Sequence, residues 1–327
     1  MKQISINSND AENRIDKFMF KAFPNIPEAL VYKYIRKKRI KINNKKCNIS
    51  DKLKIGDVIF LYINDELLEP LNNKNDFFLA PTKLDIVYED QNILLVNKKP
   101  GLAVHSGKEN ETDSLISRIK NYLFQKKEYD PKNENSFSPA LVNRIDRNTS
   151  GIVIAAKNAE TLRILNQKMK SREIKKSYIC ITYGVPPKKS DILEGYLEKN
   201  SKQNKVYISK KQSNLKNAKN ILTKYTVIDQ TKKFSILKVD LLTGRTHQIR
   251  AHLASINCPI LGDGKYGKNS VNRKAKYKYQ ALCSYKLTFE FKNDCGILEY
   301  LNYKTFEIPK DQIWFIKDFY TNLSRLS

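Results

Sequence analysis

The sequence has no long apolar segment. No run among its 327 residues approaches the roughly 18 consecutive apolar residues that mark a membrane-spanning helix. Residues 1–5 also lack the apolar stretch of a signal peptide. These two absences predict a cytoplasmic protein without a membrane partner.

Cysteine and histidine are scarce and scattered. The five cysteines form no Cys-x-x-Cys pair, and only three histidines accompany them. His247 and His252 also lack the four-residue spacing of the zinc-protease helix. The chain has neither a Walker loop nor a Rossmann fingerprint. We therefore expect free thiols, no metal and no cofactor.

Acidic residues are few compared with basic ones. Sixty Lys and Arg stand against 34 Asp and Glu, which leaves a formal net charge of +26. Such an excess indicates a polyanionic partner, either nucleic acid or an anionic membrane. Nucleotide bias in a genome would explain the preference for Lys over Arg, but it does not by itself explain the excess of bases over acids.

What the chain does have is enough length and apolar content for two globular domains. Residues 13–24 place apolar side chains on one helical face, and a second helix is expected from Pro27 to about Arg39. Short strands are expected at 40–42 and 57–62. Residues 1–63 thus form a small α/β domain in this interpretation. Its second helix ends in a basic cluster: Arg36, Lys37, Lys38 and Arg39.

The rest of the chain predicts a larger α+β domain at 81–327, after a linker without clear periodicity at 64–80. Strands outnumber helices there and several are linked as hairpins, so its sheet is expected to be mixed and mostly antiparallel. The expected strands are 84–88, 93–97, 152–156, 177–183, 222–229 and 234–241, and the expected helices are 112–124 and 159–171.

A polar loop at 143–151 runs directly into the apolar strand at 152–156. It contains Asp146, flanked by Arg144 and Arg147. An acid held ionised by arginines at the mouth of a buried strand suits a nucleophile or an anionic anchor. A well-capped turn, in which Thr149 and Ser150 bond the backbone, fits the same residues equally well. The spacing alone does not decide between these interpretations.

A second informative segment lies at 242–253. Read as the start of a helix, it puts His247 and Arg250 three positions apart on one face. A lone histidine in such a place is more often structural than catalytic, so this spacing does not by itself establish chemistry.

Together these segments resemble the RluA-type pseudouridine synthases. Residues 143–151 are similar to the family loop His-Arg-Leu-Asp-x-x-Thr-Ser-Gly, with Asn143 in place of His and Ile145 in place of Leu. Residues 244–250 match Gly-Arg-Thr-His-Gln-Ile-Arg letter for letter, and 261–267 continue the match. Residues 97–105 resemble a Lys-Pro-x-Gly segment, compressed by one residue. The similarity covers nearly all of 81–292, and residues 13–62 resemble the RNA-binding module of ribosomal protein S-four.

The resemblance implies a role for each matching residue. Asp146 would be the nucleophile or base at the ribose, and Arg250 would hold its carboxylate ionised. Tyr178 would stack on the flipped uracil as a candidate general base, and Leu282 would pack on the other side of the base. Arg144 would fill the gap left by the nucleotide. The remaining expected RNA contacts are Arg245, His247 and the cluster of Arg36, Lys37, Lys38 and Arg39.

The expected activity is isomerisation of uridine to pseudouridine in RNA, most simply in large-subunit ribosomal RNA, by a monomer. One alternative is a catalytically silent RNA-binding or ribosome-assembly factor on the same fold, although the intact Asp146, Tyr178 and Arg250 argue against it. Another is a hydrolase of glycosidic bonds, which normally needs two carboxylates flanking the bond. The sequence offers only one convincing acid.

Overall fold

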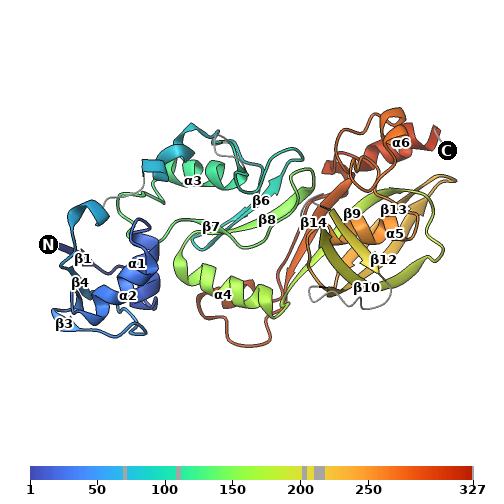
Figure 1. Ribbon diagram of the computed structural model, residues 1–327. Coiled ribbons are helices and arrows are strands. Elements are labelled where there is room, and N and C mark those ends of the chain that lie inside the picture. Colours follow the sequence, from blue (N-terminus) through green and yellow to red (C-terminus); the bar gives the residue numbers. More distant parts are fainter. Residues whose placement is uncertain (69–71, 108–111, 201–204, 210–217, 326–327) are drawn as a thin grey trace.

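The computed structural model describes residues 1–68, 72–107, 112–200, 205–209 and 218–325 (Figure 1). A small N-terminal module lies at one end of the molecule, and a long, strongly curved sheet extends away from it. No helix in the part of the chain that the structure describes has both the length and the apolar character needed to span a membrane.

The N-terminal module contains a four-stranded sheet in the order β1-β4-β2-β3 and two helices. The elements are β1 (Lys2–Ser5), α1 (Ile15–Ala22), α2 (Glu28–Arg36), β2 (Ile40–Ile42), β3 (Lys45–Lys46) and β4 (Val58–Leu61). Both predicted helices and both predicted strands are confirmed, whereas β1 was not predicted. The turn between β2 and β3 places Asn43 and Asn44 at φ of 50° and 61°, the backbone that a tight hairpin requires. The apolar faces of α1 and α2 pack on this sheet as a core of their own.

The described parts of the expected linker, residues 64–68 and 72–80, contain regular structure. They include two 3-10 helices, η1 (Asp65–Leu68) and η2 (Asn72–Leu79). Leu68 packs into the N-terminal core, whereas Phe77 packs with the helix of the large domain that contains Asn121. The Asn121 Nδ2 donates to the carbonyl of Ala80 over 2.7 Å. The segment is therefore shared between two cores, and boundaries at 63 and 81 stay a prediction.

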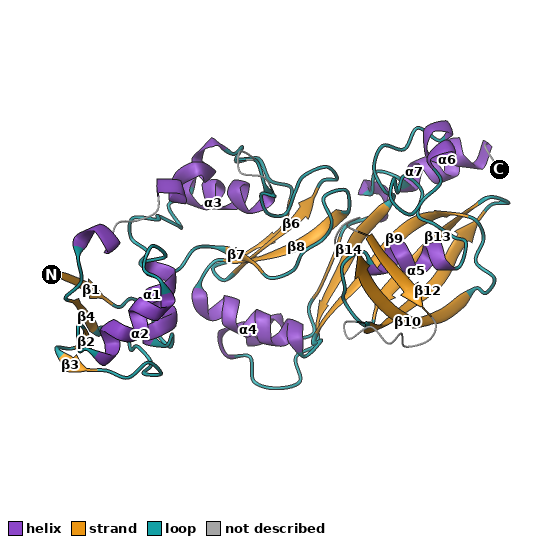
Figure 2. Ribbon diagram, viewed as in Figure 1, coloured by secondary structure: helices purple, strands orange, loops and turns teal. Residues whose placement is uncertain are grey.

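The large domain is built on an 11-stranded sheet in the order β11-β10-β12-β13-β9-β14-β8-β6-β5, with β7 and β15 pairing off this path (Figure 2). Strands β8 and β14 are parallel, and the other strand pairs described in this sheet are antiparallel. The predicted mixed, mostly antiparallel sheet is confirmed. Its strands are β5 (Ile86–Glu89), β6 (Ile93–Lys98), β7 (Ala140–Leu141), β8 (Ser150–Ala156), β9 (Ile174–Tyr183), β10 (Ser190–Asn200), β11 (Lys205–Ser209), β12 (Lys219–Gln230), β13 (Phe234–Leu241), β14 (Leu282–Phe289) and β15 (Thr305–Glu307).

Helices cover both faces of this sheet. They are α3 (Leu115–Gln125), α4 (Ala159–Lys170), α5 (Gln248–Ser255), α6 (Asn269–Lys274) and α7 (Ile316–Asp318), with the short turns η3 (Gly296–Leu301), η4 (Lys310–Gln312) and η5 (Phe319–Leu323). The predicted N-cap of α4 is confirmed, because the Asn158 side chain accepts from the Thr161 N–H over 2.8 Å. Helix α5 lies within the curve formed by β10, β12 and β13 (Figure 1).

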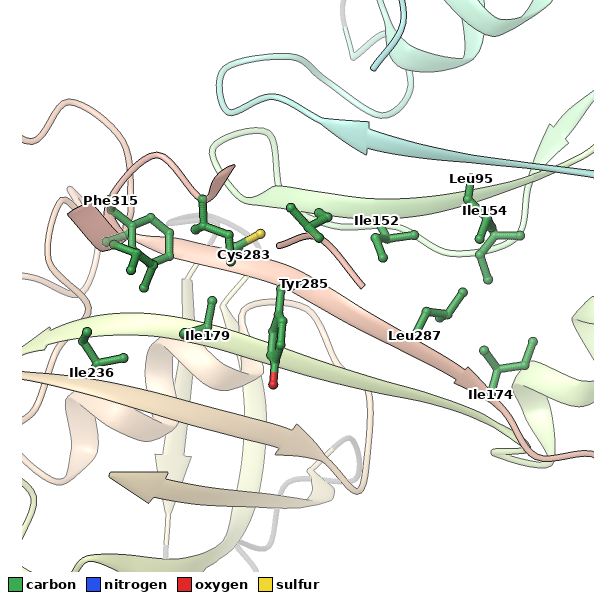
Figure 3. Close-up of a cluster of buried hydrophobic side chains, with 14 of the residues drawn as sticks. Leu95, Ile152, Ile154, Ile174, Ile179, Ile236, Cys283, Tyr285, Leu287 and Phe315 are labelled. Atoms are coloured by element: carbon green, nitrogen blue, oxygen red, sulfur yellow. The ribbon is translucent and has the colours of Figure 1, made fainter. Parts of the chain in front are cut away.

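Strand β8 is buried along its whole length, because a hydrophobic cluster lies on each of its two faces. Ile152 and Ile154 point into the largest hydrophobic cluster, where they meet Leu287 of β14 (Figure 3). Alternate residues of the same strand, Val153 and Ala155, face the cluster beneath α3. A strand apolar on both faces is typical of a sheet covered on both sides, and this agrees with the prediction of a fully buried strand after the polar loop.

Strands β8 and β14 approach unusually closely at Gly151. Its φ is +116°, and a Cβ atom there would lie 2.4 Å from the backbone nitrogen and oxygen of Ser284. Only glycine tolerates both the backbone conformation and this contact. The parallel pairing of these two strands therefore depends on the glycine that ends the polar loop.

We expect Gly151→Ala to lower the free energy of unfolding by about 2 kcal/mol or more, because backbone strain and overpacking add. Chemical denaturation measures the change. Gly244→Ala is the matched control, since a Cβ at Gly244 would meet nothing within 4 Å. Equal stability of the two variants would contradict the close approach of β8 and β14.

Candidate active site

The centre of the site is an ion pair between the polar loop and helix α5. The Arg250 Nη1 lies 2.7 Å from the Asp146 Oδ2, although the two residues are 104 positions apart in the sequence. Arg250 is buried, whereas the Asp146 side chain keeps 27% of its surface exposed. The acid is therefore fixed by a buried cation and still open to a ligand.

A second acid, Asp263, fixes the arginine. The Arg250 Nε and Nη2 donate to the two Asp263 oxygens over 2.7 and 2.8 Å, and Asp263 is fully buried. The backbone N–H groups of Lys265 and Tyr266 donate to the same carboxylate. Burial opposes the charge of Arg250, but the hydrogen bonds and charges of Asp263 and Asp146 raise its pKa. The guanidinium is thus held in one plane with a single donor directed at Asp146.

Sequence reasoning missed this role of Asp263. The residue lies in the 261–267 segment of the family match, but no function was assigned to it. A usable signal existed, because an arginine on an apolar helix must be paired when it is buried. The nearby acid in the next loop was the natural partner.

The two arginines adjacent to Asp146 in the sequence, Arg144 and Arg147, are both exposed. The expectation that they hold its carboxylate ionised stays a prediction, whereas the buried Arg250 contacts that carboxylate. Arg147 contributes its carbonyl, which accepts from the Gly101 N–H over 2.9 Å and from the Lys98 Nζ over 2.8 Å. The cation that reaches Asp146 comes from α5.

Lys98 joins the Pro100-Gly101 turn to the polar loop. Its buried ammonium donates to the carbonyls of Lys99, Leu102 and Arg147 over 2.8 to 3.0 Å. Burial lowers the pKa of Lys98 to about 7, with the charge of Asp146 acting in the opposite direction. Residues 97–105, the segment that resembles Lys-Pro-x-Gly, therefore pack against the loop that carries Asp146.

His247 also lies near the acid. Its Nε2 is 3.8 Å from the Asp146 Oδ2, and its Nδ1 is 3.0 Å from the Tyr266 hydroxyl. Burial lowers the pKa of His247, so the neutral ring is favoured. The residue precedes α5, with φ of 56°, and the helix begins at Gln248. Arg245 is exposed, and its backbone N–H donates to the Gln248 side chain.

An apolar wall stands beside the acid. Tyr178 of β9 and Leu282 of β14 are 5% and 3% exposed and belong to one cluster, against which Ile145 packs. Burial raises the pKa of Tyr178 to about 12; the charge of Asp146 adds to this, whereas a hydrogen bond with Ser284 opposes it. The phenol therefore carries its proton at neutral pH before a substrate binds, which disfavours a role as a general base in that state.

The structure supports the turn interpretation in part: the Ser150 Oγ donates to the Leu282 carbonyl over 3.3 Å, whereas the Thr149 Oγ1 bonds a side chain. The buried Asn143 accepts from the Ile154 N–H over 2.8 Å and donates to the Ile152 carbonyl over 3.3 Å. The Gln280 side chain donates to the Thr149 Oγ1 over 2.5 Å. Asn143, which departs from the family pattern, thus anchors the loop to β8 and does not contact Asp146.

Among the described residues, no three His, Cys, Asp or Glu side chains are grouped as metal ligands would be. The expected RNA-binding cluster lies outside the active site, at the C-terminal end of α2. All four of its members are exposed: Arg36, Lys37, Lys38 and Arg39.

Comparison with known proteins defines the class. The family model for RNA pseudouridylate synthase matches residues 92–255, and the S4 domain model matches residues 13–59. Among solved structures, human RNA Pseudouridylate Synthase Domain Containing 1 superposes with a TM-score of 0.53 at 23% identity, covering 66% of this chain and 82% of that one. This likeness concerns the fold.

Similar curated sequences extend over most of the chain. An uncharacterized RNA pseudouridine synthase of Mycoplasma capricolum is 37% identical over 319 residues, which are 96% of this chain and 99% of that protein. The ribosomal large subunit pseudouridine synthase C of Buchnera aphidicola subsp. Baizongia pistaciae is 35% identical over 84% of each chain. This chain belongs to the RNA pseudouridylate synthase family. It is a pseudouridine synthase that isomerises uridine in RNA and carries an N-terminal S4 domain.

The histidine within α5, His252, provides a test of burial in this region. His252 is 2% exposed, its Nδ1 lies 2.9 Å from the Thr223 Oγ1, and burial lowers its pKa to about 4. Because an unfolded histidine titrates near 6.5, acid favours the unfolded state as pH falls from about 6.5 to 4.

We expect the parent to lose about 3 kcal/mol of stability over that pH range beyond what His252→Gln loses, since the variant has no proton to take up there. Urea unfolding at pH 7 and pH 4 measures both proteins. An equal loss of unfolding free energy in the two proteins would show that the pKa of His252 is the same in the folded and unfolded states.

Proposed function

We propose that this enzyme isomerises uridines of large-subunit ribosomal RNA, with Asp146 acting directly at the ribose. The observation that carries the proposal is the Asp146 carboxylate, held at 2.7 Å by the buried Arg250 and partly open beside an apolar wall. A carboxylate in this position can attack the sugar or remove a proton from it.

The reaction breaks the bond between ribose and the uracil nitrogen and makes a bond to carbon 5; the carbon-5 proton leaves to solvent, and the freed nitrogen takes up a proton. The detached uracil must turn without escaping, and an apolar slot suits this step better than an open wet cleft. Tyr178 and Leu282 supply the slot in our proposal, with the protonated phenol as a stacking face and a hydrogen-bond donor. His247 contacts the substrate from the other side of Asp146.

The uridine must leave its stack before it reaches Asp146. Unstacking costs roughly a few kcal/mol, so a side chain that fills the vacated place favours the flipped state. Arg144 is exposed and lies two residues before Asp146. We assign it this role, with Arg245 as a further exposed cation on the RNA-facing side.

The choice of ribosomal RNA rests on the names of relatives and on charge. Relatives from Buchnera aphidicola and Rickettsia bellii are named ribosomal large subunit pseudouridine synthase C, at 35% and 30% identity. The exposed cluster at the end of α2 and the net charge of +26 suit phosphate contacts along such an RNA. We further propose that residues 1–63 and 81–327 act as two domains of a cytoplasmic monomer that uses no cofactor.

Asp146→Asn should abolish turnover, because an amide neither attacks the sugar nor removes its proton, while folding and RNA affinity change little. Tritium released from carbon 5 of uridine in ribosomal RNA measures turnover, and filter binding measures affinity. Arg250→Lys should give a partial loss, since a point charge replaces a planar fork between two acids. A parent-like rate in Asp146→Asn would place the chemistry elsewhere.

Replacing the four cations of the α2 cluster by Gln should reduce the slope of log affinity against log salt by about 3, because each lost phosphate contact contributes roughly 0.7 to 0.9. Titrations of a ribosomal RNA fragment at several salt concentrations give the slope. Arg36→Lys with Arg39→Lys keeps the charges and should keep the slope. An unchanged slope in the neutral variant would exclude this cluster as a phosphate site.

A further inference from the structure

The S4 domain contacts the large domain at a second place besides the connecting chain. The contact joins the loop before α1 to the segment between α3 and β7. Asp10 is fully buried there, and its two oxygens accept from the Ser136 Oγ and the Asn135 Nδ2, each over 2.6 Å. Asn135 also donates to the Ser5 carbonyl over 3.0 Å.

The contact continues onto the start of α4. Asn9 contacts both the segment between α3 and β7 and the start of α4. Its Nδ2 donates to the Glu134 Oε1 over 2.7 Å, and its Oδ1 accepts from the Ala159 N–H over 3.0 Å. The Arg163 Nη1 donates to the Ala11 carbonyl over 3.0 Å. We call this set of hydrogen bonds, centred on Asp10, the latch.

The latch and the connecting chain attach to different faces of the sheet. The chain enters through Phe77, which packs with α3, whereas the latch includes the first turn of α4. Helices α3 and α4 lie on opposite sides of β6 and β8 (Figure 1). Domains joined by one linker reorient freely unless their interface restrains them. Two attachments on opposite faces remove the rotation that one attachment leaves.

The contacts of the latch are better suited to fixing the relative orientation of the two domains than to binding them tightly. Its contacts are hydrogen bonds, which weaken steeply with a change of angle, and not apolar contacts, which tolerate sliding. A buried carboxylate that loses its donors is strongly disfavoured, so Asp10 allows one docked arrangement. The distance and direction from the α2 cluster to Asp146 are fixed as a result.

We propose that the latch holds the S4 domain in one orientation and thereby determines which uridine of a bound RNA reaches Asp146. Asp10, Asn135 and Ser136 are positioning residues in this inference, which rests on the proposed function. RNA held at two sites benefits from a fixed separation, because binding at the second site requires the correct geometry.

The test uses Asn135→Ala with Ser136→Ala, which removes the large domain's donors to Asp10 and leaves the Asn7 N–H, a donor from the same module as Asp10, in place. Asn133→Ala is the matched control, since its side chain bonds Asp130 within the same segment. All five native cysteines are buried, so spin labels can be placed selectively at Lys45→Cys and Lys170→Cys, two exposed positions on the two domains. Pulsed electron resonance without RNA then gives the distribution of distances between the domains.

We expect one narrow distance in the parent and the control, and a broad distribution in the double variant. With ribosomal RNA, modification of the preferred uridine relative to other uridines should fall roughly tenfold in the double variant. Its rate on an unstructured oligonucleotide too short to reach the S4 domain should match the parent. A broad distribution in the parent, or a narrow one in the double variant, overturns the latch.

A broadened distance with an unchanged site preference overturns the link to specificity. Failure of the proposed function is distinguishable, because it would appear as a parent that does not modify ribosomal RNA, while the distance measurement requires no RNA. Asp10→Asn provides a second variant from the other domain. Its amide places a donor against the donors of Asn135 and should broaden the distance in the same way.

Discussion

The Asp146, Arg250 and Asp263 triad is the interaction on which the rest of the structure depends. One guanidinium joins a fully buried acid to a partly exposed one, and the three groups come from the loop before β8, helix α5 and the loop after it. Removing one partner of the buried Arg250 and Asp263 pair would cost about 3 to 5 kcal/mol, whereas Asp146 is partly exposed and its loss leaves that pair intact. The fold must therefore bring these three segments together, and the order of the strands does so. Parallel pairing of β8 with β14 aligns the polar loop with Leu282, and antiparallel pairing of β14 with β9 adds Tyr178.

Much of this fold follows from local patterns. The helices at 15–22 and 159–170 have clear apolar faces, and Asn158 identifies the start of the second one. The buried strand β8 and the hairpin of β12 and β13 can also be predicted from the sequence, because alternation and turn residues are local properties. Strands β10, β11 and β14 were not predicted. β10 carries many exposed residues, and β14 is defined by partners more than a hundred positions away.

The residues of the candidate site likewise fall into those that the sequence predicted and those that only the structure identified. The family motifs led to Asp146, Tyr178, Arg250 and Leu282, and the structure brings all four to one place. Periodicity could not identify Lys98 as part of the site, since its three carbonyl contacts exist only after folding, and Asp263 could be found only by asking which acid pairs with a buried Arg250. Adjacency in the sequence suggested Arg144 and Arg147 as partners of Asp146, whereas the contact at 2.7 Å comes from Arg250, 104 positions away. Adjacent residues in an extended loop point in different directions, so neighbours in sequence are poor candidates for contact.

The exposed acid of the site, Asp146, is opposite in sign to the net charge of the chain. An RNA phosphate is attracted by a chain of net charge +26 but repelled by an exposed carboxylate. Arg250 offsets Asp146 at 2.7 Å, and Asp263 is fully buried, so the repulsion is short-ranged. In the proposed mechanism, phosphates bind the exposed cations while a neutral base and its sugar enter the apolar slot. The carboxylate then meets the ribose, because the same cations hold the backbone of that nucleotide outside the slot.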